Sequence, residues 1–191
     1  MVDTTIDNFK NSYATFADFA DYSYKCVSYL IDTVTGSETI WRLLYYNSAD
    51  AWDTSLCPNL SHSKKAVLIY NSQPDSTPFR VFMDSGNPDV WTKEICQLRI
   101  YPCKLFSENR DRGIVLMQID FFCHYKINQL TNYQTRVDLG IKELIGTLNG
   151  AYISGIGRLH FNGAESAEDK VLSAGQLPFK GKSLYMSNKD V

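Results

Sequence analysis

The chain has 191 residues, of which 44% are hydrophobic and 21% are charged, and its formal net charge is -2. This length and composition fit one folded domain and exclude a chain that is disordered throughout. Domains that bind a specific duplex DNA sequence usually carry a basic excess, because they neutralise phosphates. No basic stripe occurs here, which argues against sequence-specific DNA binding but leaves room for a channel through which DNA passes.

The cysteines and the N-terminus indicate the compartment. The five cysteines are scattered, at Cys26, Cys57, Cys96, Cys103 and Cys123. Their odd number and the lack of any CxxC spacing describe neither a disulfide framework nor a structural zinc site. The N-terminal residues lack the features of a signal peptide, and no apolar run approaches the ~20 residues that span a bilayer. We therefore expect a protein that stays in a reducing cytoplasm, or in a particle assembled there, without a membrane partner.

Residues 1–71 have the pattern of a mainly helical N-terminal region. Apolar side chains recur at three- and four-residue spacing from Ile6 to Ile31, which places them on one helix face. After a break, Ser37 is the expected N-cap of a second helix, and Ser61 is the expected N-cap of a third, shorter one.

The rest of the chain, residues 72–191, has the pattern of a sheet-plus-helix core. Residues 79–83 are a candidate strand. Apolar and polar side chains alternate over residues 96–101 and, for longer, over residues 115–125, which is the two-residue period of half-buried strands. The connection over residues 107–113 is short and polar. These two runs predict a long antiparallel β-hairpin.

A helix is predicted directly after the hairpin, with Thr131 or Asn132 as its N-cap. One apolar stripe runs along it at helical spacing and consists of Val137, Ile141, Leu144, Ile145 and Leu148. Gly150 ends the helix, because glycine readily adopts the left-handed conformation found there.

The end of the chain returns to strand patterns. Residues 152–161 form a strand signal that two glycines interrupt, residues 162–176 form an insertion rich in small and acidic residues, and residues 178–187 form a last strand signal. The order of elements predicts a single α+β domain over residues 1–191. We expect an antiparallel sheet with a long β-hairpin, helices packed on one face, and a helical N-terminal region.

Candidate catalytic groups are few. Cys123 and His124 resemble a nucleophile and its base, but neighbours on a strand point to opposite faces and cannot hydrogen-bond to each other. His124, His160 and Asp120 would form a metal site only if their strands bring them together. The sequence therefore predicts no catalytic residue, no cofactor and no metal site, and the protein is not expected to be an enzyme.

A family resemblance covers about two-thirds of the chain. Its clearest runs are residues 97–102 (QLRIYP), 118–124 (QIDFFCH) and 133–138 (YQTRVD), and it continues in 155–159 (GIGRL), 179–184 (FKGKSL) and, upstream, 40–51 (IWRLLYYNSADA). These runs resemble the tail terminator and tail-completion (neck) proteins of tailed bacteriophages. The resemblance implies a structural virion protein with a sheet, a long hairpin and helices against the sheet.

The same resemblance implies how the protein assembles. Members of that family form rings, usually hexamers, which terminate the tail tube in the neck and join it to the head connector. The implied partners are further copies of the chain, connector or adaptor proteins, and tail tube and sheath proteins, with DNA passing through the lumen. We hypothesise that the hairpin tip, with Glu108, Arg110, Asp111 and Arg112, is an assembly contact.

Two other functions stay open on the residues alone. One is a small intracellular enzyme whose active site is assembled from distant positions, because sequence spacing does not reveal such convergence. The other is a non-viral adaptor domain that binds one protein partner.

Overall fold

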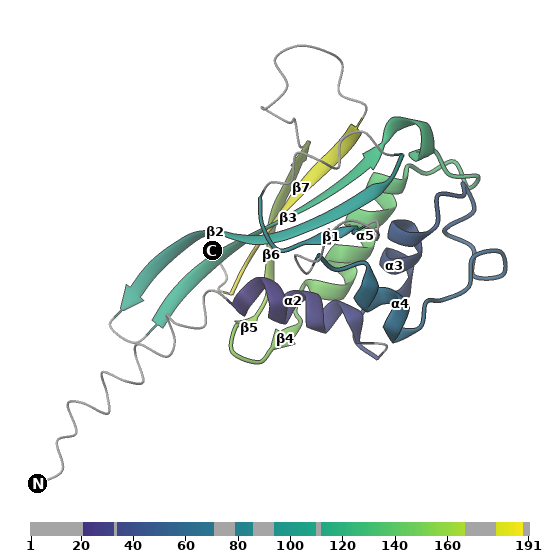
Figure 1. Cartoon of the computed structure of the whole chain (residues 1–191). Coiled ribbons are helices and arrows are strands. Elements are labelled where there is room, and N and C mark those ends of the chain that lie inside the picture. Colours follow the sequence, from purple (N-terminus) through teal and green to yellow (C-terminus); the bar gives the residue numbers. More distant parts are fainter. Residues whose placement is uncertain are drawn as a thin grey trace, which may run out of the picture.

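The computed structural model describes residues 21–32, 34–70, 79–85, 94–109, 112–166 and 179–188, so the predicted helix before residue 21 lies outside the described residues. The helices are α2 (Tyr22–Ile31), α3 (Glu38–Tyr45), α4 (His62–Val67), the short 3-10 helix η3 (Tyr125–Ile127) and α5 (Arg136–Leu148). The strands are β1 (Val81–Phe82), β2 (Cys96–Asn109), β3 (Arg112–His124), β4 (Tyr152–Ile153), β5 (Gly157–Arg158), β6 (His160–Ser166) and β7 (Phe179–Ser187). Figure 1 shows the helices on one face of the main sheet, which confirms the predicted α+β class.

The main sheet has five strands in the order β1-β2-β3-β7-β6. Its pairs are antiparallel except for β1, which lies parallel to β2. The predicted antiparallel sheet is therefore confirmed, and the parallel β1 at its edge is a detail that the period of a strand does not report. β6 begins at His160 and continues into the region predicted as an insertion, since residues 163–166 pair with β7.

The predicted hairpin is longer than its alternating pattern. Pairing continues to Asn109 on β2 and restarts at Arg112 on β3, so most of the predicted loop over residues 107–113 is strand. Two β-bulges interrupt the register of β2, one between Pro102 and Lys104 and one close to the tip. At the other end, Tyr125 was expected to continue the strand but begins η3 and is 55% exposed.

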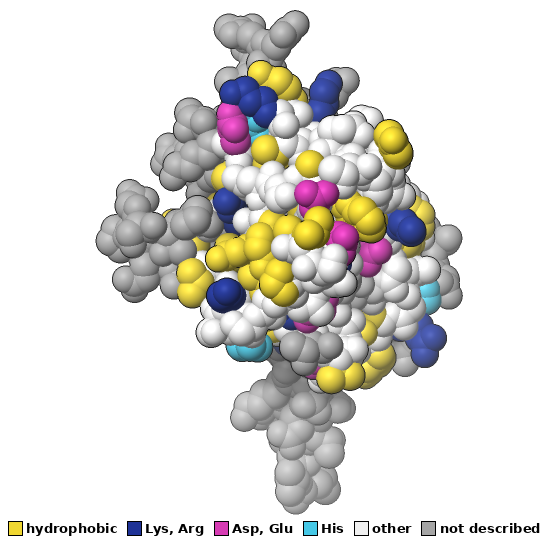
Figure 2. Space-filling view, turned by 90° about the vertical axis from the view of Figure 1, so that its right-hand side faces the viewer, with side chains coloured by type: hydrophobic (Ala, Val, Ile, Leu, Met, Phe, Trp, Pro, Cys, Tyr) yellow, Lys and Arg dark blue, Asp and Glu magenta, His cyan; other side chains and the backbone are white. Residues whose placement is uncertain are grey.

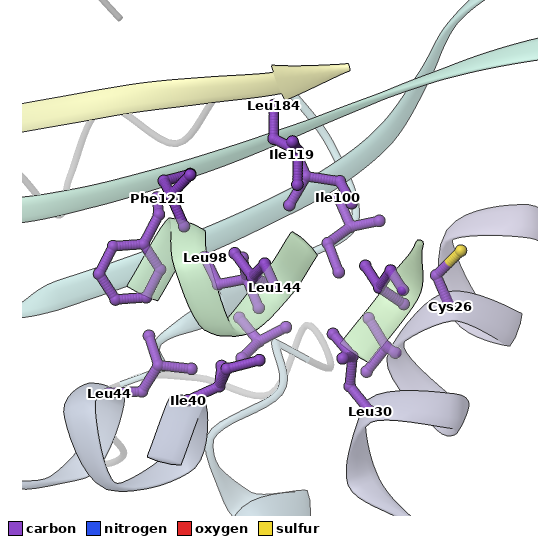
Figure 3. Close-up of a cluster of buried hydrophobic side chains, with 14 of the residues drawn as sticks. Cys26, Leu30, Ile40, Leu44, Leu98, Ile100, Ile119, Phe121, Leu144 and Leu184 are labelled. Carbon is purple, nitrogen blue, oxygen red and sulfur yellow. The ribbon is translucent and has the colours of Figure 1, made fainter. Parts of the chain in front are cut away.

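The hydrophobic core lies between the helices and the near face of the sheet. Figure 3 shows Leu98, Ile100, Ile119, Phe121 and Leu184 from the sheet, which point toward Leu30, Ile40, Leu44 and Leu144 from the helices. All nine side chains are fully buried. Burial of each contributes about 1.5–3 kcal/mol relative to exposure, so this layer is the main source of stability.

Helix α5 confirms the predicted stripe but not the predicted cap. Val137, Ile141, Leu144 and Leu148 are buried, and Gly150 has a positive φ of 80° just after the helix. The N-cap is Thr135, whose Oγ1 accepts a 3.0 Å hydrogen bond from the backbone N–H of Asp138. Thr131 and Asn132 instead belong to a turn closed by a bond from Leu130 N to Gln134 O, and that turn delays the helix by one turn.

Candidate assembly interface

The β2–β3 hairpin extends beyond the strands that flank it. β1 pairs with β2 only at Leu98 and Arg99, and the pairing of β7 with β3 ends at Leu116. Within the described residues, no further strand pairs with residues 104–109 and 112–115. Together with Leu116 we call these residues the arm, and Figure 1 shows it projecting from the body of the molecule. The side chain of Asn188 covers part of the β3 edge, because it accepts from the N–H of Val115 (2.9 Å) and donates to the carbonyl of Gly113 (3.2 Å). On the β2 side, an edge without a neighbouring strand presents N–H and C=O groups that another chain can pair with.

The arm exposes apolar side chains. Phe106 lies opposite Ile114, so their side chains lie on the same face of the sheet. Farther along β3, the side chains on this face are Gln118 and Asp120. Phe106 is 50% exposed and Leu105, on the other face, is 39% exposed. Ile114 and Leu116 are half-buried beside them. A polar sheet face thus becomes apolar where the hairpin leaves the body, which is typical of a contact surface.

Two of the four tip residues named from the sequence, Glu108 and Arg112, fall at the far end of the arm. Glu108 sits in the second bulge of β2 and Arg112 begins β3, opposite Asn109. Arg110 and Asp111 lie outside the described residues. The tip is thirteen residues from the first residue of β2, or about 40 Å at about 3.3 Å per residue. The hypothesis that the tip is an assembly contact stays a prediction.

The opposite end of the molecule carries a second exposed apolar surface, which no sequence pattern had indicated. It includes Tyr45 (39% exposed), Trp52 (37%), Leu56 (64%) and Tyr133 (94%), and we call these four residues the aromatic end. Figure 2 looks onto this side of the molecule and shows a central hydrophobic patch with both acidic and basic side chains at its margin.

Hydrogen bonds hold the two loops of the aromatic end together. Trp52 Nε1 donates to Thr131 Oγ1 (2.9 Å), and Thr131 Oγ1 donates to Asp50 Oδ1 (2.7 Å). The backbone N–H of Thr131 also donates to the carbonyl of Ala49 (3.1 Å). Because these bonds join residues about eighty positions apart, sequence spacing had no means of indicating the surface.

Tyr133 adopts an unusual backbone conformation. Its φ is +65°, which makes it the only non-glycine residue with positive φ in the described part of the chain. For a bulky residue this conformation is strained, and the surrounding structure must hold it. The N–H of Tyr133 donates to Leu130 O (3.2 Å), and the N–H of Gln134 donates to Asn132 Oδ1 (3.2 Å). The loop therefore holds a nearly fully exposed aromatic ring on a fixed backbone.

The enzyme-like pairs do not form a site. Cys123 lies in the core, with its Sγ 3.0 Å from Cys96 Sγ, and burial raises the pKa of its thiol. His124 lies on the other face and accepts a bond from Lys126 N through Nδ1, which confirms that the two neighbours point apart. His124 and His160 flank β7 at opposite ends, opposite Phe179 and Ser187, and are roughly 25 Å or more apart.

Asp120, the third residue of the possible metal set, is part of a polar network. Its Oδ1 accepts from Ser183 Oγ (2.6 Å) and Gln118 Nε2 (3.0 Å), and its Oδ2 accepts from the Tyr101 hydroxyl (2.9 Å). Burial, followed by the Asp120 carboxylate, raises the pKa of Tyr101. The network ties three strands together, and three donors already occupy the carboxylate. Within the described ranges, no group of three or more His, Cys, Asp or Glu residues could hold a metal ion.

The matched family places the chain in the class of phage-related proteins. It belongs to the YomW family, whose model matches residues 37–187 and so spans every element from α3 to β7. The predicted phage relationship is therefore confirmed at this level. No curated protein matches the chain. None of the helices in the described residues is both long enough and apolar enough to cross a membrane.

Proposed function

We propose that the chain is a structural subunit of a tailed-phage particle, which forms a ring in the neck, terminates the tail tube and joins it to the head connector. The observation that carries this proposal is the arm, whose exposed Leu105 and Phe106 project from the body of a phage-related protein. An exposed apolar strand edge is an aggregation hazard for a protein that works alone. It suits a subunit that pairs with a neighbour.

A ring explains the charge of the chain as well. Its copies repeat one contact around an axis, and DNA passes through the lumen toward the tail tube. Affinity for DNA comes mainly from neutralised phosphates, so a lumen without a basic excess lets DNA slide. The net charge of -2 supports this arrangement. The proposed partners are further copies of the chain, the connector above, and the tail tube and sheath below.

The tip provides the test. Arg110→Glu together with Arg112→Glu reverses two charges at the end of the arm and should leave folding intact, as measured by circular dichroism. We expect phage carrying this variant to accumulate separate heads and tails in electron micrographs. Lys142→Glu together with Arg158→Glu is the matched control, because both side chains are exposed and lie outside the arm. Normal infectious particles from the tip variant would contradict the proposal.

A protein-binding adaptor is the second candidate, because the same exposed arm would also suit a single partner. Mass photometry of the purified protein separates the two functions. A closed ring, or copies that assemble only on tail tubes, supports the neck subunit. A stable one-to-one complex with one partner, without self-association, supports the adaptor.

A further inference from the structure

We propose that Cys96 and Cys123 form an intramolecular disulfide when the protein meets a small-molecule disulfide such as oxidised glutathione. Cys96 is the first residue of β2 and Cys123 the last but one of β3, and both are free thiols in this structure. The spacing of the cysteines in the sequence did not single out this pair, because 27 positions separate its members. The inference goes beyond the proposed function, and the bond itself does not depend on a ring.

The backbone holds the two cysteines at the spacing that a disulfide needs. They are direct partners in the antiparallel register of β2 and β3. The N–H of His124 donates to the carbonyl of Ile95 (3.0 Å), so the hydrogen-bonded pair lies one residue further out and Cys96 and Cys123 form a non-hydrogen-bonded pair. Such pairs hold their Cα atoms about 4.5 Å apart, within the range of roughly 4.4–6.8 Å found across disulfides. The bond therefore closes without a change of register.

Both side chains point into the core and toward each other. Cys96 is 1% exposed and Cys123 is 0% exposed, and their Sγ atoms lie 3.0 Å apart. A disulfide bond is about 2.05 Å long, so small rotations of the two side chains need to bring the sulfurs about 1 Å closer. Among the described residues, no other two thiols lie within hydrogen-bonding distance of each other, although Cys26, Cys57 and Cys103 are also free.

The position of the pair gives an oxidant a route to it. Cys96 and Cys123 are the last pair in the β2–β3 register at the end away from the arm, and β7 also begins beside them, at Phe179. Strand ends open locally at a much lower free energy than the whole fold unfolds. Burial, followed by the contact with Cys96, raises the pKa of Cys123, while the charges of Arg136 and Arg80 oppose that rise. Because the thiolate is the reactive form, we expect slow oxidation through such openings.

The reaction is a thiol–disulfide exchange in two stages. One cysteine thiolate attacks a sulfur of the small disulfide and releases one small thiolate, which leaves a mixed disulfide on the protein. The second cysteine thiolate attacks the protein sulfur of that mixed disulfide and releases the second small thiolate. Two cysteine thiols are thereby oxidised to one disulfide, one small disulfide is reduced to two thiols, and the two cysteine protons end on the released thiolates.

The bond would fasten the base of the hairpin whose other end is the arm. Small thiols keep cysteines reduced in the cytosol, whereas proteins outside the cell meet oxidising conditions. A subunit of a released particle makes that passage, so the bond would form after assembly and fix the two strands together. This timing rests on the proposed function, whereas the reactivity of the pair does not.

Oxidation of the purified protein tests the bond. The folded chain is incubated with an excess of oxidised glutathione, quenched in acid, alkylated, and mapped by peptide mass spectrometry without reduction. We expect a crosslinked peptide that joins Cys96 to Cys123. The oxidised protein should also melt roughly 5–10 °C above the reduced protein, because the bond closes a long loop of the unfolded chain. A reductant should reverse both effects.

Variants of three cysteines provide the controls. Cys96→Ala and Cys123→Ala should each lose the crosslink and the shift in Tm. Cys103→Ala is the matched control, because it removes a cysteine from the same hairpin and keeps both partners, so it should behave like the wild type. The wild-type peptide map decides the question even where a core variant folds poorly. A folded wild type whose Cys96 and Cys123 stay free, carry glutathione separately or pair with other cysteines overturns the inference.

Phage particles separate the bond from its timing. The chain mapped from released particles should carry the crosslink, and the chain mapped from infected cells before lysis should carry the free thiols. Free thiols in released particles, together with a crosslink in the oxidised purified protein, overturn the timing and leave the bond. Absence of the chain from released particles overturns the proposed function and leaves the bond.

Discussion

Arg136 donates a 2.7 Å hydrogen bond through Nη1 to the backbone carbonyl of Tyr46, and this bond fastens the start of α5 to the end of α3. The same fully buried guanidinium reaches the carbonyls of Leu43 (2.9 Å), Ser48 (2.7 Å) and Ile127 (3.0 Å). The last carbonyls of a helix have no partner within the helix. Arg136 satisfies those of α3 and fixes the beginning of the loop that carries Trp52.

Arg136→Met should therefore destabilise the protein strongly. The apolar side chain keeps much of the volume but leaves several buried carbonyls without a donor, at about 1–3 kcal/mol for each group that water does not reach. We expect a loss of about 3 kcal/mol or more in urea unfolding. Lys142→Met is the control, because Lys142 is exposed on the same helix. Equal unfolding midpoints for the two variants would show that the carbonyl contacts contribute little.

Gly140 and Gly146 on α5 should respond to alanine in opposite directions. A Cβ at Gly140 would lie 2.9 Å from the ring of Phe121, whereas a Cβ at Gly146 would meet nothing within 4 Å. Gly140→Ala should cost about 1–3 kcal/mol from overpacking, reduced by the higher helix propensity of alanine. Gly146→Ala should raise stability by up to about 1 kcal/mol. Thermal unfolding of both variants checks the close approach of α5 to the sheet, and a stabilised Gly140→Ala would contradict it.

The ion pair between Lys65 and Glu38 should show strong coupling. Lys65 is fully buried, and its Nζ bonds to Glu38 Oε1 and to the carbonyl of Ile31 (3.4 Å). Glu38→Gln leaves a buried ammonium without its counter-ion and should cost about 2–3 kcal/mol, somewhat below a fully buried pair because Glu38 is partly exposed. Adding Lys65→Met to Glu38→Gln should recover part of that loss. A double-mutant cycle measures the coupling free energy between the two residues, and purely additive effects would rule out the coupling.

Asp138 should contribute a small, pH-dependent part of the free energy of unfolding. Lys182 Nζ bonds to its Oδ1 (2.5 Å) and Thr135 donates to its Oδ2 (2.6 Å), and these bonds lower the pKa of the carboxyl below its ordinary 3.8. A depressed folded-state pKa stabilises the fold above the unfolded value and loses that effect as pH falls through the folded value. Asp138→Asn should therefore cost about 0.5 kcal/mol at pH 7 and almost nothing near pH 2. A difference that persists unchanged at pH 2 would assign the effect to packing.

The periodic patterns in the sequence predicted the elements that are half-buried. Alternation over residues 96–101 and 115–125 predicted the hairpin, and the stripe from Val137 to Leu148 predicted α5, because one face of each packs on the core. The prediction failed where backbone pairing or a turn sets the first or last residue of an element. The arm continues past the alternating pattern through backbone pairing alone, and the α5 cap moved to Thr135 because a turn precedes it.

The sequence predicted only one of the two exposed surfaces, the hairpin tip. The hairpin places Glu108 and Arg112 at one end of the molecule, as the residue pattern had indicated. The aromatic end had no such signal, because its residues come from two segments that have no common period. A fully buried Lys65 was equally unexpected, since lysine is rarely buried unless it is paired, and its partner Glu38 lies 27 residues away in the sequence.

The sequence by itself determined the α+β class, the hairpin, the helix after it and the lack of a local catalytic motif, because each depends on residues close together in the chain. Only the tertiary structure decided which surfaces stay exposed, how far the arm projects and that the aromatic end lies opposite to it. The physical reason is that exposure and placement depend on which distant segments pack together. Contacts such as those of Arg136 with α3 and of Trp52 with Thr131 fix that packing across about eighty or more residues.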